Sequence, residues 1–395
     1  MSTYEYYKDI FANTPRPFAM LDLDMLDDNA RAIAQAAGSK KVRLASKSIR
    51  SVDVLRRILN ADPAFQGIMC YTAAEAVFLA GHGFDDLLLG YPQWEPQAIQ
   101  SLVNLVGDGR SVTLMVDSLE HIMHIEQFAK QQGTVVPLCI DVDMSMSYPG
   151  LHFGVWRSPI SSWDGMQSLV ERILQSPWLR LDGIMGYEAQ VAGVGDNAAG
   201  KWLKNQAVQF LKKRSIVEAA KRRQEVVEQL ALMKVALRFV NAGGTGSMES
   251  SRQEAWVTEI TAGSGFYAPG LFDHYASFRY KPAAAYAVEV VRIPKPGLVT
   301  CMGGGYTASG AVGQDKLAKP YLPTGLRLLA LEGVGEVQTP LQLPEQTQLK
   351  LGDPVFFRHA KAGELCERFN TLYAVSQGRI VDEYATYRGM GECFL

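Results

Sequence analysis

Short apolar runs rich in β-branched residues alternate with amphipathic helical patterns along the first two thirds of the chain. This alternation is typical of a parallel sheet built from repeated strand–helix units. Eight runs of the strand type occur, at Val42–Ser46, Gly67–Tyr71, Leu87–Gly90, Val112–Val116, Val135–Val142, Asp182–Tyr187, Ala236–Asn241 and Ala255–Thr261. Because eight such units close a cylinder, the pattern predicts an α/β fold with a (β/α)8 TIM-type barrel.

The helices between these strands carry recognisable start and stop signals. Thr72 followed by Glu75 predicts a capping box, and Gly81 and Gly83 end that helix. Apolar residues at three- and four-residue spacing predict further helices over Leu26–Ala37, Glu95–Val106, Leu119–Gln132, Trp163–Gln175 and Asn197–Met233. The last of these is rich in Lys and Arg, but its interleaved glutamates favour a solvated helix face over a nucleic-acid patch.

After about residue 270 the pattern changes to short strands separated by Gly and Pro turns. The expected strands are Ala284–Arg292, Gly297–Met302, Leu326–Val337 and Asp353–Arg358. They predict a C-terminal antiparallel β domain, with which the segment Phe18–Leu26 can pair. We therefore expect an N-terminal segment over 1–24, the barrel over 25–269 and the β domain over 270–395.

Composition excludes several classes of partner. The 39 Lys and Arg residues nearly balance the 41 Asp and Glu residues, so no field of one sign favours nucleic acid or an anionic membrane. A small polar substrate fits this charge balance better than either of these partners.

The chain shows no signal-peptide pattern at its start and no apolar run long enough for a membrane span, so we expect a cytoplasmic protein. Its 5 cysteines are scattered and odd in number, which argues against a disulfide framework.

Reactive groups of a βα barrel stand where its strands end, and Lys47 lies at the end of the first strand. From this feature alone a solvated surface lysine is the more common outcome. Neighbouring cations such as Arg43 and Arg50 would favour the neutral amine that Schiff-base formation needs.

Glycine-rich loops follow the seventh and eighth strands. Gly243, Gly244 and Gly246 allow consecutive backbone N–H groups to converge on an anion, and the second loop contains Gly263 and Ser264. Each loop alone could be an ordinary turn. Phosphate sites of βα barrels are built from these two loops, however, so a lysine facing them suits pyridoxal phosphate.

The order of these pieces resembles the fold-type III pyridoxal phosphate enzymes. The resemblance is strongest to the D-threonine aldolase, D-serine dehydratase and D-threo-3-hydroxyaspartate dehydratase group, in the alanine racemase N-terminal domain superfamily. It covers nearly the whole chain, through the segments 17–24, 43–50, 186–188 and 243–247. The resemblance implies that Lys47 binds pyridoxal 5'-phosphate covalently. It also implies that the cofactor lies beside Tyr187 and is held at Gly243, Gly244, Thr245, Gly246, Ser247, Gly263 and Ser264.

Two positions depart from that group. Many relatives have an arginine that reaches the cofactor's phenolic oxygen where this chain has His152, so His152 is expected to substitute for it. The alternative is an ordinary core or loop histidine. Thr261 stands where alanine racemases place an arginine on the pyridine nitrogen. A threonine would leave that nitrogen largely unprotonated, which argues against a standard racemase.

The resemblance also implies a divalent metal ion, held in the β domain by a histidine and by a cysteine or aspartate two residues later. His359 matches the histidine, but Lys361 occupies the second position. Cys366 is then the expected second ligand, with Glu364 as the alternative. Imidazole with thiolate suits zinc, whereas a carboxylate suits manganese or magnesium. His359 can also be a structural histidine with no metal.

The implied activity is a metal-assisted lyase that cleaves β-hydroxy-D-amino acids by a retro-aldol reaction, giving glycine and an aldehyde. Dehydration of D-serine or D-3-hydroxyaspartate with loss of ammonia is the second candidate. An amino-acid racemase that uses Lys47 and Tyr267 is the third, and a non-catalytic pyridoxal phosphate carrier is the fourth. The resemblance further implies a homodimer, in which the β domain of one subunit closes the barrel mouth of its partner. The exact substrate and the pathway are not determined by the sequence.

Overall fold

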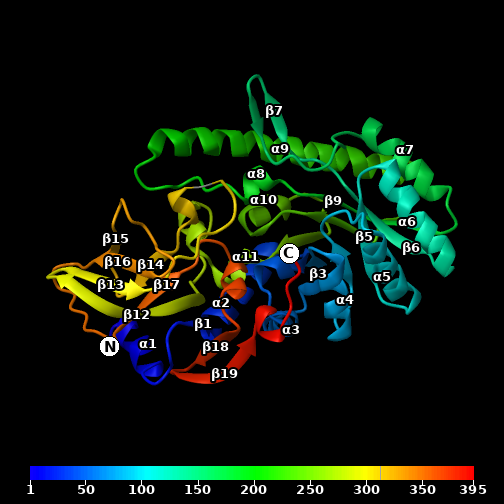
Figure 1. Cartoon of the computed structure of the whole chain (residues 1–395). Helices are drawn as coiled ribbons and strands as arrows, with labels where there is room; N and C mark the ends of the chain where they lie inside the picture. Colours follow the sequence, from blue (N-terminus) through cyan, green and yellow to red (C-terminus); the bar gives the residue numbers. More distant parts are fainter. Residues whose placement is uncertain (312) are drawn as a thin grey trace.

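Eight parallel strands form a closed barrel in a computed structural model that describes residues 1–311 and 313–395 (Figure 1). The strands are β2 (Lys41–Ala45), β3 (Phe65–Cys70), β4 (Leu87–Leu89), β5 (Val112–Val116), β6 (Val136–Asp141), β9 (Leu179–Gly186), β10 (Phe239–Ala242) and β11 (Glu259–Ala262). They neighbour one another in chain order, and β11 closes the barrel on β2. Each of them overlaps one of the eight predicted runs, so the predicted barrel is confirmed.

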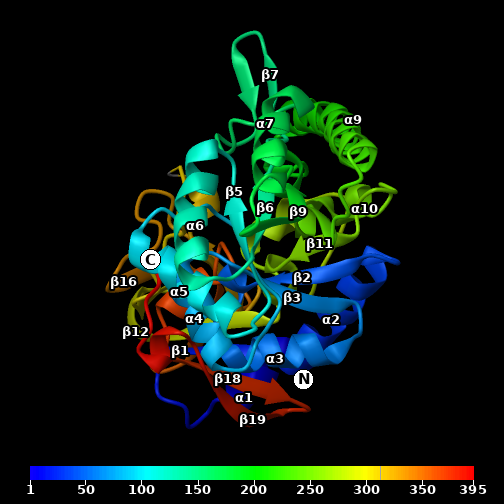
Figure 2. The same ribbon diagram turned by 90° about the vertical axis from the view of Figure 1, so that its right-hand side faces the viewer.

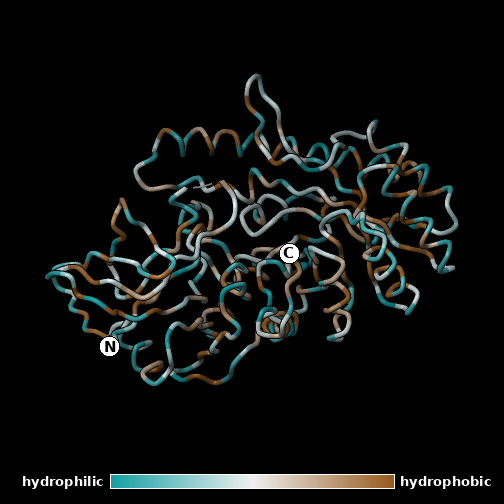
Figure 3. Tube along the Cα trace, in the orientation of Figure 1, coloured by the Kyte–Doolittle hydropathy of each residue, from teal (hydrophilic) through white to brown (hydrophobic). Residues whose placement is uncertain are grey.

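Helices surround these strands (Figure 2). The longer ones are α2 (Leu23–Ala37), α3 (Val52–Ala61), α4 (Ala73–Gly81), α5 (Pro96–Gly107), α6 (Leu119–Gln132), α7 (Trp163–Leu174) and α9 (Trp202–Leu232). Single-turn helices α8 (Ala189–Ala192), α10 (Met248–Ser251) and α11 (Ser264–Tyr267) lie in the loops near the carboxyl ends of the strands. Hydrophobic and hydrophilic residues recur in turn along the longer helices (Figure 3), as a helix with one buried face requires.

The capping box predicted at α4 forms only in part. Thr72 accepts a hydrogen bond from the backbone N–H of Glu75, as expected. The carboxylate of Glu75 instead accepts from the N–H of Tyr71 and from the hydroxyl of Tyr387, far along the chain. This buried carboxylate therefore joins the barrel to the C-terminal segment.

The C-terminal part is a separate sheet of nine strands. Its path runs β15-β16-β13-β12-β1-β18-β19, with β17 pairing both β12 and β14. The bounds are β1 (Phe18–Asp22), β12 (Ala284–Lys295), β13 (Leu298–Met302), β14 (Lys319–Leu322), β15 (Arg327–Leu328), β16 (Gln338–Gln342), β17 (Pro354–Arg358), β18 (Thr371–Ser376) and β19 (Arg379–Ala385). Strand β1 lies antiparallel to β12 and parallel to β18, so one pairing of an otherwise antiparallel sheet is parallel.

One predicted strand, Leu326–Val337, is wrong. Only Arg327–Leu328 is a strand, and the chain then turns before β16 begins at Gln338. Gly335 explains the break, because a Cβ there would lie 2.1 Å from the carbonyl oxygen of Gln338. Such a close approach belongs to a tight turn rather than to an extended strand.

The remaining elements lie outside both sheets. Helix α1 (Thr3–Ile10) packs under the β domain, and the hairpin β7 (Met146–Tyr148) and β8 (Leu151–Phe153) projects from the barrel (Figure 1). Within the described residues, none of the helices combines the length and the apolar character that crossing a bilayer demands. All 5 cysteines are free, as expected.

The interior of the barrel is filled, which confines any cavity to its mouth. Side chains of Leu88, Met115, Cys139, Met185 and Phe239 form a separate buried cluster between the strands. Beside them Arg43 is fully buried and binds Glu259, with 2.7 Å between Nε and Oε1. The guanidinium of Arg43 also contacts Asp86. Because these charges are paired, this part of the barrel is a structural core.

Candidate active site

A cavity of about 530 Å³ opens at the carboxyl ends of the barrel strands. Its wall combines those strand ends with residues of the segments 269–275 and 361–364. Most of the predicted site residues line it, namely Lys47, Tyr187, Gly243, Gly244, Thr245, Gly246, Gly263 and Ser264. Four others, His152, Ser247, His359 and Cys366, are not among its lining residues.

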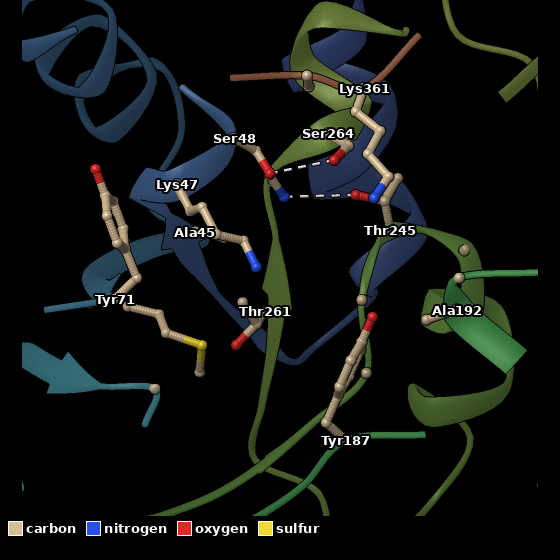
Figure 4. Close-up of a pocket in the computed structure, with 18 of the residues that line it drawn as sticks. Ala45, Lys47, Ser48, Tyr71, Tyr187, Ala192, Thr245, Thr261, Ser264 and Lys361 are labelled. Carbon is tan, nitrogen blue, oxygen red and sulfur yellow. Dashed lines mark hydrogen bonds between the residues drawn. The ribbon is translucent and has the colours of Figure 1, made fainter. Parts of the chain in front are cut away.

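Lys47 lies in a 3-10 turn, Ser46–Ser48, directly after β2. Its amine is directed into the cavity, toward Thr261 (Figure 4), and donates to the hydroxyl of Tyr91 at 3.1 Å. The guanidinium of Arg50 donates to the carbonyl oxygen of Lys47 and holds the turn in place. The strand therefore delivers the amine of Lys47 to the barrel mouth, as its position in the sequence predicts.

The two arginines expected to act on Lys47 are both paired with carboxylates. Arg43 binds Glu259 inside the barrel, and Arg50 binds Glu367 of the C-terminal segment. Their charges are thus largely balanced by these partners. Neither Arg43 nor Arg50 is therefore the free cation that the sequence pattern suggests.

Two glycines of the loops after β10 and β11 are required by close contacts. A Cβ at Gly246 would lie 2.2 Å from the carbonyl oxygen of Ala192, and one at Gly263 would lie 2.8 Å from the Cβ of Ser48. The hydroxyls of Ser48 and Ser264 lie 3.1 Å apart at the same edge of the cavity (Figure 4). Bare backbone and hydroxyl groups therefore meet where an anion such as a phosphate can be held.

Thr245 and Ser247 support these loops from within. The hydroxyl oxygen of Thr245 accepts from the N–H groups of Gly263 and Gly265, at 3.4 and 3.2 Å, which ties the two loops together. The hydroxyl of Ser247 accepts from the N–H of Gly244 at 3.1 Å. Ser247 thus shapes the loop without lining the cavity.

The floor of the cavity is polar but uncharged. Thr261 and Asn241 line it, and the Asn241 amide nitrogen donates to the Thr261 hydroxyl oxygen at 2.9 Å. The same amide donates to Glu259 at 2.8 Å, which continues to the buried Arg43. A ring nitrogen placed on this floor would meet a neutral hydroxyl rather than a cation.

The cavity wall beside Tyr91 and Tyr187 contains an arginine that the sequence pattern did not single out. The Nε of Arg157 donates to Asp141 at 2.6 Å, and its guanidinium lies 4.8 and 5.9 Å from the ring centroids of Tyr91 and Tyr187. Burial raises the pKa of Asp141 to about 6, although Arg157 opposes that shift. Burial, together with the charge of Glu188, raises the pKa of Tyr187 to about 12, so its phenol stays protonated.

His152 lies on the β7–β8 hairpin, away from the lining residues. Its ring stacks on Trp156, with 3.8 Å between ring centroids, and its Nδ1 lies 3.5 Å from the Ser147 hydroxyl. Arg157, five residues later in the same loop, is the group that reaches the cavity. The sequence contains a signal for it, since Arg157 is the next cation after the expected position.

His359 and Cys366 lie behind the Lys47 turn. The thiol of Cys366 and the hydroxyl of Tyr267 both donate to the carbonyl oxygen of Ile49, at 3.3 and 2.9 Å. Burial raises the pKa of Cys366 to about 12, so this group is a thiol. Tyr267 is fully buried and does not line the cavity, which argues against a racemase that uses it.

The imidazole of His359 is buried, and neither ring nitrogen has a hydrogen-bond partner within residues 1–311 and 313–395. Burial, with repulsion from Arg358, lowers its pKa to about 3. His359 also lines a second cavity of about 460 Å³, which shares Lys361 and Glu364 with the first. Among the described residues, no group of three or more His, Cys, Asp and Glu side chains is arranged for a metal ion.

Lys361, which in the sequence is only a mismatch to the expected metal ligand, reaches the cavity from the β domain (Figure 4). Its amine donates to the carbonyl oxygen of Ser309 at 2.7 Å. Burial lowers the pKa of Lys361, and the charges of Lys316 and Lys47 act in the same direction, whereas Glu364 opposes them.

Fold and site together define a βα-barrel protein in which a lysine and two glycine-rich loops line one cavity at the barrel mouth. The family model described as alanine racemase, N-terminal domain, matches residues 21–269, and the chain belongs to this family. The 3-hydroxy-D-aspartate aldolase of Paracoccus denitrificans (strain Pd 1222) is 25% identical over 250 residues. That match covers 63% of this chain and 59% of the relative, so this chain matches less than two thirds of the relative's length.

Solved structures agree with the fold over almost the whole chain. D-threonine aldolase from Filomicrobium marinum has a TM-score of 0.81 at 16% identity, covering 96% of each chain. D-threo-3-hydroxyaspartate dehydratase from Delftia sp. HT23 has a TM-score of 0.74 at 19% identity, covering 95% of this chain and 98% of that one. Variants of D-threo-3-hydroxyaspartate dehydratase have a substituted histidine or, two positions later, a substituted cysteine, the latter in a metal-free form. The resemblance to fold-type III pyridoxal phosphate enzymes is thereby confirmed.

Proposed function

We propose that this protein is a pyridoxal phosphate-dependent lyase acting on β-hydroxy-D-amino acids. The observation that carries the proposal is that Lys47 and both glycine loops line one cavity at the barrel mouth. The relatives named as aldolase and dehydratase support the reaction class. We place retro-aldol cleavage to glycine and an aldehyde first, because the curated relative is named as an aldolase.

The residues present fit the cofactor. Gly246 and Gly263 line the cavity at positions where close protein contacts exclude any side chain, and with Ser48 and Ser264 they would hold its phosphate. Thr261 would face the ring nitrogen, and Tyr187 would lie beside the ring. When bound, the cofactor supplies an electron sink for the bonds at the substrate's α-carbon.

Side chains of the protein would then hold the cofactor and transfer protons. Lys47 holds the cofactor and afterwards stands free to take or return a proton at the α-carbon. Arg157, held by Asp141, would contact the phenolic oxygen, the role for which the resemblance suggests His152. A role of His152 at that oxygen stays a prediction, and no support for it comes from its position on the hairpin.

The experiment that tests the proposal is borohydride reduction of the purified protein loaded with pyridoxal phosphate, followed by peptide mapping. We expect a visible absorption band that reduction bleaches, with the label on Lys47, and no label in the Lys47→Ala variant. D-threonine and D-threo-3-hydroxyaspartate are then assayed for aldehyde and glycine, and in parallel for ammonia and a keto acid. Ammonia release without aldehyde would replace the aldolase by the dehydratase. Label on another residue, or no turnover of either kind, would refute the proposal.

The predicted metal ion fits the structure poorly, so no step is assigned to it. The sulfur of Cys366 lies 3.3 Å from the carbonyl oxygen of Ile49, and Cys366 lines neither of the two cavities. His359 has two unpartnered nitrogens among the described residues, but the residue two positions later is the cation Lys361. Glu364 lines both cavities, although its oxygens accept from the N–H of Ser309.

A homodimer is also part of the proposal. Helix α9 exposes several large apolar side chains, Trp202, Leu203, Phe210 and Val217, each more than half exposed. Such side chains on a long helix suit burial against a second copy. Light scattering during gel filtration tests this, and a monomer at micromolar concentration would contradict it. The cytoplasmic location stays a prediction.

A further inference from the structure

Lys361 stands at the junction of the two cavities. It lies in the loop after β17, and its side chain lines both the cavity of Lys47 and the neighbouring cavity of His359. Figure 4 shows it extending from the β domain on the side of Ser264 and Thr245. The β domain therefore places a cationic side chain over the same space as the reactive lysine of the barrel.

The loop that bears Lys361 is held against the Lys47 turn. Gly363, two residues later, has φ +82°, and a Cβ on it would lie 2.0 Å from the carbonyl oxygen of Lys47. The Cys366 thiol donates to Ile49, and Arg50 pairs with Glu367. These contacts fix the position of Lys361 relative to Lys47, so its place in the cavity is built into the fold.

The direct hydrogen-bond partners of Lys361 are neutral, and no carboxylate forms an ion pair with its amine among the described residues. Its amine donates to the carbonyl oxygen of Ser309 at 2.7 Å and lies 3.5 Å from the Ser309 hydroxyl, and both acceptors are neutral. The nearby carboxylate of Glu364 accepts from the N–H of Ser309. An ammonium held in this way favours an anionic oxygen brought to it by a ligand.

The same position disfavours a metal ion. The resemblance places a metal ligand two residues after the histidine, and here that residue is an ammonium, which repels a divalent cation. Cys366 lines neither cavity, and its sulfur lies against the carbonyl oxygen of Ile49. The residues around His359 thus lack a second metal ligand, because the position expected to supply it carries the positive charge of Lys361.

We propose that the ammonium of Lys361 contacts the oxygen on the substrate's β-carbon and serves as the cation there, in place of a divalent metal held through His359. This inference rests on the proposed lyase function. In a retro-aldol reaction the β-hydroxyl proton would pass to the amine of Lys47, freed from the cofactor by the substrate, and the electron pair of the broken Cα–Cβ bond would pass to the electron sink that the cofactor supplies. Negative charge develops on the β-oxygen as its proton leaves, and the proton on Lys47 then returns to the α-carbon. A preorganised donor aimed at such an oxygen accelerates reactions by roughly 100- to 1,000-fold.

The first test is the metal dependence of the wild-type protein loaded with pyridoxal phosphate. After exhaustive dialysis against a chelator, we expect unchanged turnover of D-threonine and no stimulation by added Mn²⁺. Mn²⁺ titration followed by electron paramagnetic resonance should show no tight site, with or without the cofactor. Loss of activity on chelation that Mn²⁺ restores, or one tight Mn²⁺ per chain, would overturn the inference.

Three variants give the second test. Lys361→Met should lower kcat by about 100-fold at saturating cofactor, in line with loss of one charge-stabilising donor. Lys361→Asp places a carboxylate two residues after His359, and we expect it to bind Mn²⁺ where the wild type does not. Lys316→Met is the matched control. It removes a neighbouring ammonium that pairs with Asp315 and lines neither cavity, so its activity should stay unchanged.

The remaining outcomes also decide the matter. If Lys361→Met weakens cofactor binding but keeps full turnover at saturating cofactor, Lys361 belongs to the phosphate site and the inference is wrong. If Lys361→Asp binds no more Mn²⁺ than the wild type, the position is not that of a metal ligand and the inference also fails. Both Mn²⁺ titrations can be made on protein without lyase activity, so failure of the proposed function is distinguished from failure of this inference.

Discussion

Replacing Gly363 by alanine tests whether the contact between the β domain and the Lys47 turn contributes both to the stability of the protein and to its turnover. Gly363 combines two demands, a positive φ of +82° and a backbone approach that leaves no room for a methyl group. The nearest atom to an added Cβ is the carbonyl oxygen of Lys47, at 2.0 Å. To reach an ordinary contact this separation must grow to at least 3.4 Å, which displaces either the loop or the lysine turn.

The expected cost has two parts. A Cβ in the left-handed region costs about 1 to 2 kcal/mol. Forcing a methyl group into packed backbone costs about 1 to 3 kcal/mol more. Gly352→Ala is the matched control, because Gly352 has φ +85° and nothing within 4 Å of an added Cβ. The difference between the two variants therefore isolates the steric part.

The assay is urea unfolding of the two variants and the wild type, followed by far-ultraviolet circular dichroism and by tryptophan fluorescence so that coincident transitions can be verified. We expect Gly363→Ala to lose about 1 to 3 kcal/mol more than Gly352→Ala. Because a displacement of about 1 Å can cost roughly 100-fold in rate, turnover should fall by that order in Gly363→Ala only. Equal losses of stability and unchanged turnover in both variants would refute the reasoning.

Three further predictions concern single side chains. Burial raises the pKa of Glu75 to about 7 from an ordinary 4.5. Between these two pH values the folded state binds more protons than the unfolded state, so the free energy of unfolding falls as pH rises from 4.5 to about 7. Glu75→Gln should remove up to about 3 kcal/mol of this pH dependence, measured by urea unfolding at pH 5 and pH 8, and an unchanged slope would contradict the assignment. Arg157→Met should weaken cofactor binding and shift its visible band, whereas His152→Ala should leave both unchanged; the reverse result would restore the histidine to the site. Gly246→Ala, whose Cβ would lie 2.2 Å from a backbone carbonyl oxygen, should lower cofactor affinity at least tenfold by equilibrium dialysis, about 1.4 kcal/mol, and unaltered affinity would place the phosphate elsewhere.

Much of the barrel could be predicted because its signals are local. Strand and helix patterns depend on residues a few positions apart, and every one of the eight expected runs lies in the barrel. The strands of the β domain were harder to predict from the sequence. The expected strand over 326–337 is interrupted by a turn at Gly335, and strands β18 and β19 were not predicted. Their pairing partners lie far away in the chain, so the short apolar runs alone are ambiguous.

The residues of the candidate site likewise fall into those that the sequence could predict and those that it could not. In a parallel barrel all strands end at one mouth, so the sequence by itself was sufficient to bring Lys47 together with Gly243–Gly246 and Gly263. Which cations and histidines reach that mouth depends on loop conformation and on packing between distant segments. Only the tertiary structure places Arg157 rather than His152 in the wall, and turns Cys366 toward Ile49. It alone brings Lys361 into the same cavity as Lys47, because the close contact of Gly363 with Lys47 joins two parts of the chain that no local pattern connects.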